Sequence, residues 1–240
     1  MFSYTYGVTT DKGDVRQENQ DSILCLTGIV GGAEAALFAV ADGMGGLSHG
    51  SKVSRYITAQ FERWWQEDFE QMVLDGMDRE EEIQEFLEQE IWDINQKVLT
   101  FNRTMNCRSG STLSLLLLYK EHYYIENIGD SRVYQMRKGV LTQLTKDQSV
   151  AHKLTMCVGM FGVPESFYCS GTLTAGDCYC LCSDGLYNPM NRETLEAVLA
   201  SGVSNAQEKA KRLRSRILPG RASDNVSVIV AEVEEGKETI

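Results

Sequence analysis

The stretch FAVADGMGG, residues 38 to 46, indicates how this sequence folds. It opens with an apolar run that is typical of a buried strand and places one carboxylate, Asp42, at the end of that run. Three of the next four residues are glycines. Because glycine has no Cβ atom, we expect the backbone of Gly43, Gly45 and Gly46 to approach a metal ion or its water molecules closely. The stretch therefore predicts a strand that carries one carboxylate to a functional site.

The residues around this stretch predict three strands followed by two helices. The strands are short apolar runs bounded by Gly, Asp and Asn, at residues 4–10, 22–28 and 35–41. Residues 51–68 carry apolar side chains at helical spacing. Asp78, followed three residues later by Glu81, is typical of a capping box that starts a second helix. One stripe of that helix is expected to be buried and contains Ile83, Leu87, Ile91, Ile94, Val98 and Phe101.

Strands return in the second half of the chain as an antiparallel meander. Arg137, Lys138 and Gly139 are expected to form a hairpin turn within it. Two helices and a last strand follow. The predicted strands cover residues 111–119, 122–129, 132–136, 140–145, 167–173, 178–183 and 225–233, and the helices cover 191–200 and 204–217. Strand blocks with paired helices between them predict an α+β sandwich, in which two packed antiparallel β-sheets are flanked by pairs of α-helices. No linker divides the chain, so we expect one domain over residues 1–240.

The charge of the chain excludes some classes of partner. The chain has 23 basic and 34 acidic side chains, for a net charge of -11. This is the wrong sign for binding nucleic acid or an anionic membrane, whereas it attracts divalent cations. There is no apolar stretch of about 18 residues and no leader sequence, and seven scattered cysteines indicate free thiols. We therefore expect a cytoplasmic monomer.

Five aspartates lie at the ends of predicted strands. They are Asp21, Asp42, Asp130, Asp184 and Asp224. If these strand ends converge, the carboxylates repel one another, and bound cations would relieve that repulsion. Oxygen ligands suit Mg²⁺ or Mn²⁺, and the chain has only three histidines and no His or Cys pair at zinc spacing. For any one of these aspartates, an ordinary turn is the simpler interpretation. The set together indicates a metal centre.

Seven motifs carry a resemblance to a known family. Their order and spacing resemble those of the metal-dependent protein phosphatases of the 2C type, in their compact bacterial form. The motifs are GDVRQENQDS (13–22), FAVADGMGG (38–46), GST (110–112), IGDSRVY (128–134), LTQLTKD (141–147), LCSDGL (181–186) and SDNVSVIV (223–230).

The resemblance implies a binuclear Mn²⁺ or Mg²⁺ centre at one end of the sandwich. Asp42 resembles the carboxylate that bridges both ions, and the carbonyl of Gly43 resembles a ligand of one of them. Asp184 and Asp224 resemble ligands of the other ion. Asp130, together with Asp184, resembles the site of a third, weaker ion. The expected function is hydrolysis of phosphoserine and phosphothreonine in proteins phosphorylated by a serine/threonine kinase.

Two further residues complete the expected catalytic set with Asp42. Asp21 resembles the residue that holds a metal-bound water, and Arg16 resembles the arginine that binds the substrate phosphate. This assignment agrees with the chemistry that phosphate-ester hydrolysis requires. Two ions lower the pKa of a water between them, and a guanidinium can bind two phosphoryl oxygens at once. No nucleophilic cysteine or serine is needed.

Several positions depart from the family pattern. Gln20 stands where members usually have glutamate, and Met44 stands where eukaryotic members have a histidine proposed as the general acid. The flap between residues 145–149 and 153–165 is much reduced, and Met156 occupies a position where arginine is frequent. These departures leave the general acid and the selection of substrates near the site open.

Two other functions compete with this interpretation. Residues 46–50 match the G-x-S-x-G pattern of serine hydrolases, with Ser48 as the nucleophile. The strand, however, is expected to end at Asp42, six residues before the serine, which is too early for that turn. The second alternative is a phosphatase-like module that binds or senses without catalysis, which retention of the metal aspartates disfavours.

Overall fold

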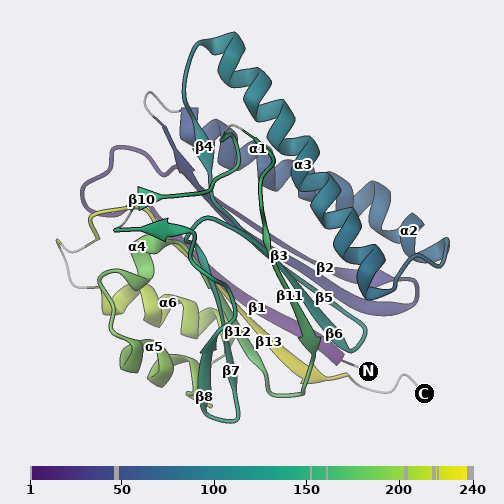
Figure 1. The fold of residues 1–240 in the computed structure, drawn as a ribbon. Helices are drawn as coiled ribbons and strands as arrows, with labels where there is room; N and C mark the ends of the chain where they lie inside the picture. The colour runs from purple at the N-terminus through teal and green to yellow at the C-terminus, as the bar shows by residue number, and fades with distance from the viewer. Residues whose placement is uncertain are drawn as a thin grey trace.

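Two antiparallel β-sheets pack face to face, with helices on their outer sides (Figure 1). The structure is a computed structural model that describes residues 2–45, 49–151, 153–160, 162–202, 205–217, 220 and 222–236. The predicted α+β sandwich is confirmed. None of the helices in the described ranges is long and apolar enough to span a bilayer.

The first sheet contains the first and the last strands of the described chain. Its strand order is β1 (Phe2–Asp11), β13 (Val226–Glu235), β12 (Cys178–Cys182), β7 (Arg132–Arg137) and β8 (Val140–Gln143). Between β7 and β8, Lys138 and Gly139 have φ values of 51° and 79°. These positive values at both central positions are those of a type I′ turn, which confirms the predicted hairpin.

The second sheet carries the FAVADGMGG stretch in its interior. Its strand order is β11 (Phe167–Thr172), β6 (His122–Ile128), β5 (Leu113–Tyr119), β3 (Ala33–Met44) and β2 (Asp21–Val30), and the short strand β4 (Gly110–Ser111) also pairs with β3. Leu115 and Leu117 of β5 face the helices, whereas Leu116 and Leu118 face the first sheet. Burial on both faces explains the continuous apolar sequence of this strand.

Helices cover each sheet from the outside. The second sheet is covered by α1 (His49–Trp64), a π-helical turn η1 (Trp65–Phe69), α2 (Glu70–Leu74) and α3 (Glu80–Met105). The first sheet is covered by α4 (Asp184–Tyr187), α5 (Arg192–Leu199) and α6 (Ala206–Arg216). In Figure 1, α1 and α3 lie on the opposite side of the paired sheets from α5 and α6.

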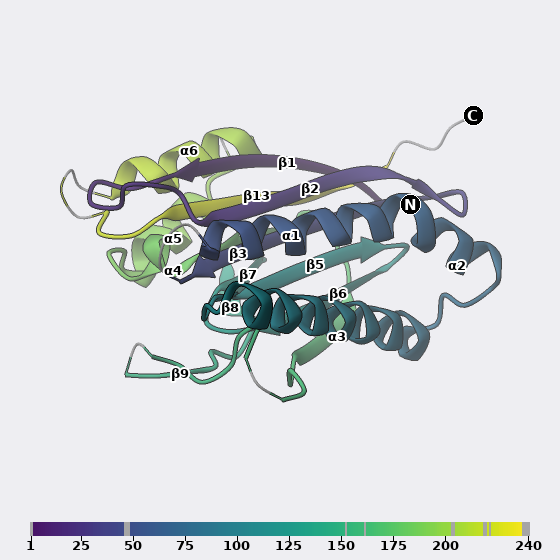
Figure 2. The same ribbon diagram turned by 90° about the horizontal axis from the view of Figure 1, so that it is seen from above.

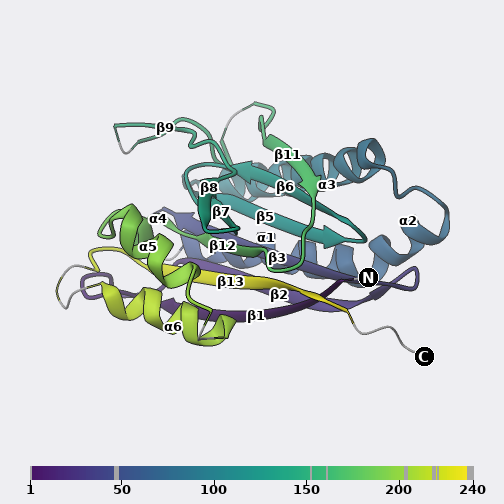
Figure 3. The ribbon, with the colours of Figure 1, turned by 90° about the horizontal axis from the view of Figure 1, so that it is seen from below.

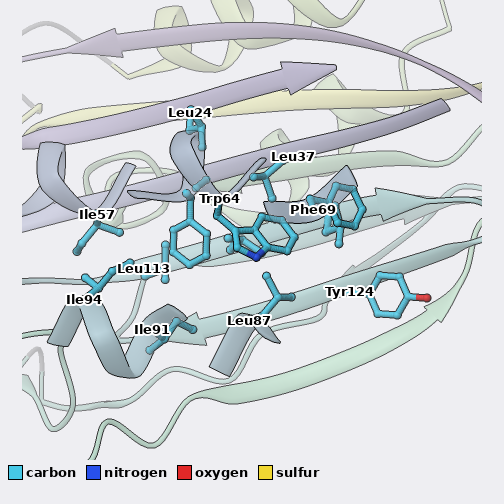
Figure 4. Packing of buried hydrophobic residues seen from close by; sticks show 14 of the residues in the cluster. Leu24, Leu37, Ile57, Trp64, Phe69, Leu87, Ile91, Ile94, Leu113 and Tyr124 are labelled. Carbon is cyan, nitrogen blue, oxygen red and sulfur yellow. The ribbon is translucent and has the colours of Figure 1, made fainter. Parts of the chain in front are cut away.

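The apolar stripes of α1 and α3 form one core with the second sheet (Figure 4). Ile57 and Trp64 of α1 are buried there together with Leu87 and Ile91 of α3. Trp64 stacks on Phe69, with 4.8 Å between ring centroids. The π-helical turn thus brings a second aromatic ring into the core after the α-helix ends.

The predicted start of α3 is wrong by one residue. Arg79 is the N-cap, and its backbone N–H donates to Glu82 Oε2 at 3.0 Å. The side chain of Asp78 instead accepts hydrogen bonds from Lys120 Nζ and, at 3.4 Å, from Tyr119 Oη. This contact with the β5–β6 turn is distant in sequence, and the local capping pattern could not show it.

Three cysteines and one lysine are buried between the first sheet and its helices. Cys178, Cys180 and Cys182 are all buried in the core that β12 forms with α5 and α6, as their alternation along the strand predicts. The basic face of α6 is only partly solvated, because Lys209 is buried and its Nζ lies 2.6 Å from Glu232 Oε1.

The flap between β8 and β11 is short. Its described residues form a hairpin of β9 (Ser149–Val150) and β10 (Lys153–Leu154) and contain no helix. Figures 2 and 3 show this hairpin extending away from the sheets. The reduced flap predicted from the sequence is therefore confirmed.

One carboxylate lies inside the core without an obvious function. Glu126 of β6 is fully buried, and neither of its carboxylate oxygens has a hydrogen-bond partner of normal geometry among the described residues. Burial raises the pKa of Glu126 from 4.5 to about 8, the nearby hydroxyl of Ser166 lowers it slightly, and Glu88 of α3 adds to the rise. At neutral pH the folded protein therefore holds this side chain as the neutral acid.

We expect Glu126→Gln to flatten the pH dependence of stability. Between about pH 5 and 8 the unfolded chain releases this proton and the folded chain keeps it, so rising pH lowers the free energy of unfolding by about 1.4 kcal/mol per pH unit. Urea unfolding at several pH values measures the slope. Glu121→Gln, at an exposed position, is the control. A slope unchanged by Glu126→Gln would show that Glu126 is ionised in the folded state.

Candidate metal centre

The five predicted aspartates converge at the end of the sheets marked by β4, β10 and α4 in Figure 1. Asp21 opens β2 and lies directly opposite Asp42 in the antiparallel pairing of β2 with β3. Asp130 lies between β6 and β7, Asp184 opens α4 after β12, and Asp224 precedes β13. The structure thus places side chains from four separate regions of the chain around Asp42.

The electrostatics of Asp42 show how close these carboxylates are. Burial raises its pKa well above the ordinary value, and the negative charges of Asp21, Asp184, Asp224 and Asp130 each raise it further. Like charges opposite each other on paired strands are destabilising. The cluster is therefore unfavourable unless protons or cations neutralise part of its charge.

Asp21 and Asp184 share this environment. Burial is the main cause that raises the pKa of Asp21, and hydrogen bonds from serine hydroxyls oppose it. Ser183 Oγ donates to Asp21 Oδ2 at 2.8 Å. Burial also raises the pKa of Asp184 to about 6, with further increases from Asp224, Asp130 and Asp21. A bound cation would stabilise the ionised form of each of these carboxylates.

Two buried oxygens favour a cation at this place. Oδ1 of Asp21 and Oδ1 of Asp184 are buried and have no hydrogen-bond partner among the residues that the structure describes. Unpaired buried oxygens are costly, and a hard cation or a water molecule bound to it would satisfy them. Among the described residues, however, no three or more His, Cys, Asp or Glu side chains gather closely enough to hold an ion by themselves. The residues therefore fit Mg²⁺ or Mn²⁺ ions that keep several water ligands.

The GST motif positions Asp42 through its backbone. The Asp42 N–H donates to Thr112 Oγ1 at 2.9 Å, and the Asp42 carbonyl accepts from Thr112 N at 2.9 Å and from Ser111 Oγ at 3.0 Å. The Thr112 and Ser131 hydroxyls lie 2.8 Å apart, which links this motif to the turn that carries Asp130. The GST motif was part of the resemblance to the family, but the sequence alone did not predict a role for these hydroxyls.

Protein backbone gives the glycine at position 43 a second reason, besides the predicted approach to a metal ion. A Cβ atom there would lie 2.4 Å from Gly50 O and 2.6 Å from Gln20 O, so protein backbone excludes a side chain. The Gly43 N–H donates to Gln20 O at 3.1 Å. Gly45 has a φ of +143°, which favours glycine, and Gly46 lies outside the described residues. The role of the Gly43 carbonyl as a metal ligand stays a prediction.

Arg16 lies at the rim of the cluster and binds one of its members. Its Nε donates to Asp224 Oδ1 at 2.9 Å and its Nη2 donates to Asp224 Oδ2 at 2.6 Å. The Arg16 side chain is 55% exposed, so solvent reaches the guanidinium. These hydrogen bonds raise the pKa of Arg16 further, and it stays charged. The structure thus brings the predicted phosphate-binding residue to the predicted centre, in contact with a carboxylate.

Asn225 holds the loop that presents Arg16. Its Nδ2 donates to the carbonyls of Lys12 and Glu18, both at 2.9 Å, and its Oδ1 accepts from Gln20 N at 2.9 Å. Asn225 lies in the motif SDNVSVIV, but the sequence alone predicted no role for it. Its partners are about 200 residues away in sequence, so no local pattern could identify them.

Arg132 and Tyr187 support Asp130, and sequence reasoning missed both. Tyr187 Oη donates to the Asp130 carbonyl at 2.8 Å. The Arg132 guanidinium lies 3.6 Å from the centroid of the Tyr187 ring, in a cation–π contact. Arg132 also forms a bidentate pair with Asp147 at the base of the flap, with 2.6 Å between Nη2 and Oδ2. The motifs IGDSRVY and LTQLTKD contain Arg132 and Asp147, and Tyr187 directly follows LCSDGL, but only the fold shows their contacts.

Gln20 and Met44, two positions that depart from the family pattern, lie beside the aspartate cluster. Gln20 Nε2 donates to Glu18 Oε1 at 2.8 Å and to the Gly45 carbonyl at 3.3 Å. Met44 is 42% exposed. Ser48, the nucleophile of the serine-hydrolase alternative, lies outside the described residues.

Comparison with known proteins agrees with this geometry. A family model described as protein phosphatase 2C matches residues 13–217. The chain belongs to the protein phosphatase 2C family.

Bacterial serine/threonine phosphatases are among the proteins most similar to this chain. The chain is 30% identical to the serine/threonine protein phosphatase PstP of Mycobacterium tuberculosis over 95% of its own length, and it spans only 45% of that protein. It is 27% identical to the serine/threonine phosphatase stp of Listeria welshimeri, with 93% of each chain covered. The crystal structure of the PstP catalytic domain in complex with 2 manganese ions has a TM-score of 0.83 and 28% identity, covering 98% of this chain and 100% of that one.

We expect Asp42→Asn to remove stabilisation by Mn²⁺ from this 2C-type domain without unfolding it. Without metal, the variant should melt at or above the wild-type temperature, because one charge of the cluster is gone. At 100 times its dissociation constant, an ion stabilises the wild type by about 2.7 kcal/mol, or about 5 to 10 °C. Thermal unfolding with EDTA and with Mn²⁺ measures both effects. Asp68→Asn, at an exposed position, is the control. If Mn²⁺ raises the melting temperature of Asp42→Asn as much as that of the wild type, the metal centre lies elsewhere.

Proposed function

We propose that this chain hydrolyses phosphoserine and phosphothreonine in proteins with the help of divalent cations. The observation that carries the proposal is the convergence of five aspartates beside a solvent-facing guanidinium, with two carboxylate oxygens buried and unpaired. Membership of the 2C family supports the same activity, as does the similarity to serine/threonine phosphatases of bacteria.

The aspartates would hold the ions in a defined arrangement. Asp42 would serve two ions, together with the Gly43 carbonyl on one side and Asp184 and Asp224 on the other. The similar PstP domain contains 2 manganese ions, which supports two principal Mn²⁺ or Mg²⁺ ions here. A third, weaker ion would rest on Asp130 and Asp184. When bound, such ions supply a water of lowered pKa and neutralise phosphoryl oxygens.

The chain's own residues would orient the reactants. Arg16 presents two N–H groups in a planar fork, and in this structure they bind both oxygens of one carboxylate. Two oxygens of a phosphoryl group offer the same two-point geometry. Asp21 is fixed through Oδ2 by Ser183, which leaves Oδ1 free to accept a hydrogen bond from the attacking water. Small errors in such positions slow an in-line attack strongly.

The substrates and surroundings of the protein remain predictions from the sequence. We propose that the substrates are proteins phosphorylated by a serine/threonine kinase, and that the chain acts as a cytoplasmic monomer. Its net charge of -11 argues against nucleic acid and anionic membranes as partners.

The first test of the activity is its dependence on metal. We expect hydrolysis of phosphothreonine peptides and of p-nitrophenyl phosphate in Mn²⁺, complete loss in EDTA, and recovery when Mn²⁺ returns. Phosphate release measures all three. Activity that survives EDTA would contradict the proposal and revive a metal-free mechanism, for which Ser48→Ala is the check. A protein that neither binds Mn²⁺ in calorimetry nor hydrolyses these substrates would be a binding or sensing module.

Arg16→Lys tests the phosphate-binding role. Lysine keeps the charge but lacks the planar fork, so we expect the Michaelis constant to rise and kcat/KM to fall by about tenfold or more. Mn²⁺ affinity by calorimetry should change little. Arg55→Lys, an exposed arginine of α1, is the control. Loss of metal affinity with an unchanged Michaelis constant would instead assign Arg16 to the support of Asp224.

A further inference from the structure

A cleft of about 540 Å³ opens beside the candidate metal centre. It lies between the C-terminal end of α3, the loop from α3 to β4, and residues 157–160 of the flap. Its lining includes Met44, Gly45, Arg103, Arg108, Cys157 and Met160. The described residues of the flap contain no helix that would cover this cleft.

The cleft lies next to the end of the strand that carries Asp42. Met44 and Gly45 line it and follow directly after Asp42 and Gly43 on the same strand end. The Gly45 carbonyl accepts a hydrogen bond from Gln20, which precedes Asp21. A chain that carries a phosphorylated residue into the centre therefore has the cleft next to it.

Hydrogen bonds fix the loop wall of the cleft. Asn102 Nδ2 donates to the Ser109 carbonyl at 2.7 Å, and Asn102 Oδ1 accepts from the Ser109 hydroxyl at 2.6 Å and from Ser109 N at 3.2 Å. Asn106, with a φ of 47°, ends the helix in the left-handed conformation. These contacts define the path of the loop and the backbone from which Arg108 extends.

The flap wall is fixed as well. Ser111 N donates to the Val158 carbonyl at 3.1 Å, and Val158 N donates to the Ser111 carbonyl at 2.9 Å. Gly159 N donates to Asn95 Oδ1 at 2.8 Å. The flap segment is thus attached both to β4 and to α3, so the cleft is a formed feature of the fold.

The charge of the lining differs from that of the whole protein. The chain has a net charge of -11, yet Arg103 and Arg108 are the charged residues of this lining and it contains no Asp or Glu. Both arginines are exposed, and neither side chain forms an ion pair or hydrogen bond with any described residue. By contrast, Arg16, Arg132 and Arg137 each bind an aspartate. The two guanidiniums are therefore available to an acidic ligand.

We propose that this cleft binds the polypeptide of the substrate next to its phosphorylated residue, and that Arg103 and Arg108 select substrates with Asp or Glu at that place. The inference rests on the proposed phosphatase function and names the substrate class of the same site. The apolar side chains of Met44, Cys157 and Met160 contact the polypeptide, and the two arginines pair with its carboxylates.

The test compares phosphothreonine peptides that carry Glu, Gln or Lys on both sides of the phosphorylated residue. For each enzyme, the ratio of kcat/KM for the Glu peptide over the Gln peptide is measured, so that changes common to both cancel. We expect a wild-type ratio of about three to ten, the size of one or two partly exposed ion pairs. The double variant Arg103→Gln, Arg108→Gln should bring the ratio near one, and Arg103→Glu with Arg108→Glu should reverse the preference toward the Lys peptide.

Arg212→Gln is the matched control, because Arg212 is exposed on α6 over the other sheet. It should leave the ratio at the wild-type value. A wild-type ratio near one, a ratio that persists in the double variant, or an equal change in Arg212→Gln would each overturn the proposal.

A second measurement keeps the cleft and the phosphatase function separable. Hydrolysis of p-nitrophenyl phosphate by the wild type in Mn²⁺ needs no flanking residues, so its absence would contradict the phosphatase function alone. The affinity of the Asp42→Asn variant for the labelled Glu and Gln peptides is then measured by fluorescence anisotropy. This variant is not expected to hydrolyse the peptides, so the measurement tests binding in the cleft alone. Equal affinity for the two peptides would overturn the cleft proposal.

Discussion

Asp21 and Asp42 face each other across the β2–β3 pair, and this opposition of two carboxylates governs the candidate site. Burial raises the pKa of both, so the apo cluster is unfavourable. The register of the strands fixes the opposition, because a slip of one strand by one residue would turn its carboxylate to the other face of the sheet. A cation bound at this cluster would offset the repulsion, and its binding would then stabilise the folded state.

Small hydroxyl side chains hold this arrangement in place. Thr112 and Ser111 bond the backbone of Asp42, and Ser183 bonds the side chain of Asp21. Ser227 N of β13 donates to Ser183 Oγ at 3.0 Å, so the bond from Ser183 to Asp21 of β2 ties the second sheet to the first. Because the supports lie on strands or directly at strand ends, the geometry of the carboxylates is set by the two sheets.

The sequence predicted the strands and the aspartates because both are local signals: apolar runs and a carboxylate after each run. It did not predict that the backbone of Gln20 and Gly50 excludes a side chain at Gly43. It misplaced the cap of α3 because Asp78 pairs with Lys120. It missed the contact of Arg132 with Tyr187 for the same reason. In each case, residues far apart in sequence decide the outcome, and only the packed fold brings them together.

Ser111 connects the two halves of the functional region. Its hydroxyl donates to the Asp42 carbonyl, while its backbone pairs with Val158 of the flap. The base of the flap is held separately, through Asp147 and Arg132, to the turn that carries Asp130. A flap fixed at both places cannot shift without straining the supports of two aspartates. Substrate selection in a chain with so short a flap therefore depends on the side chains that line the cleft, and Arg103 and Arg108 are the charged ones there.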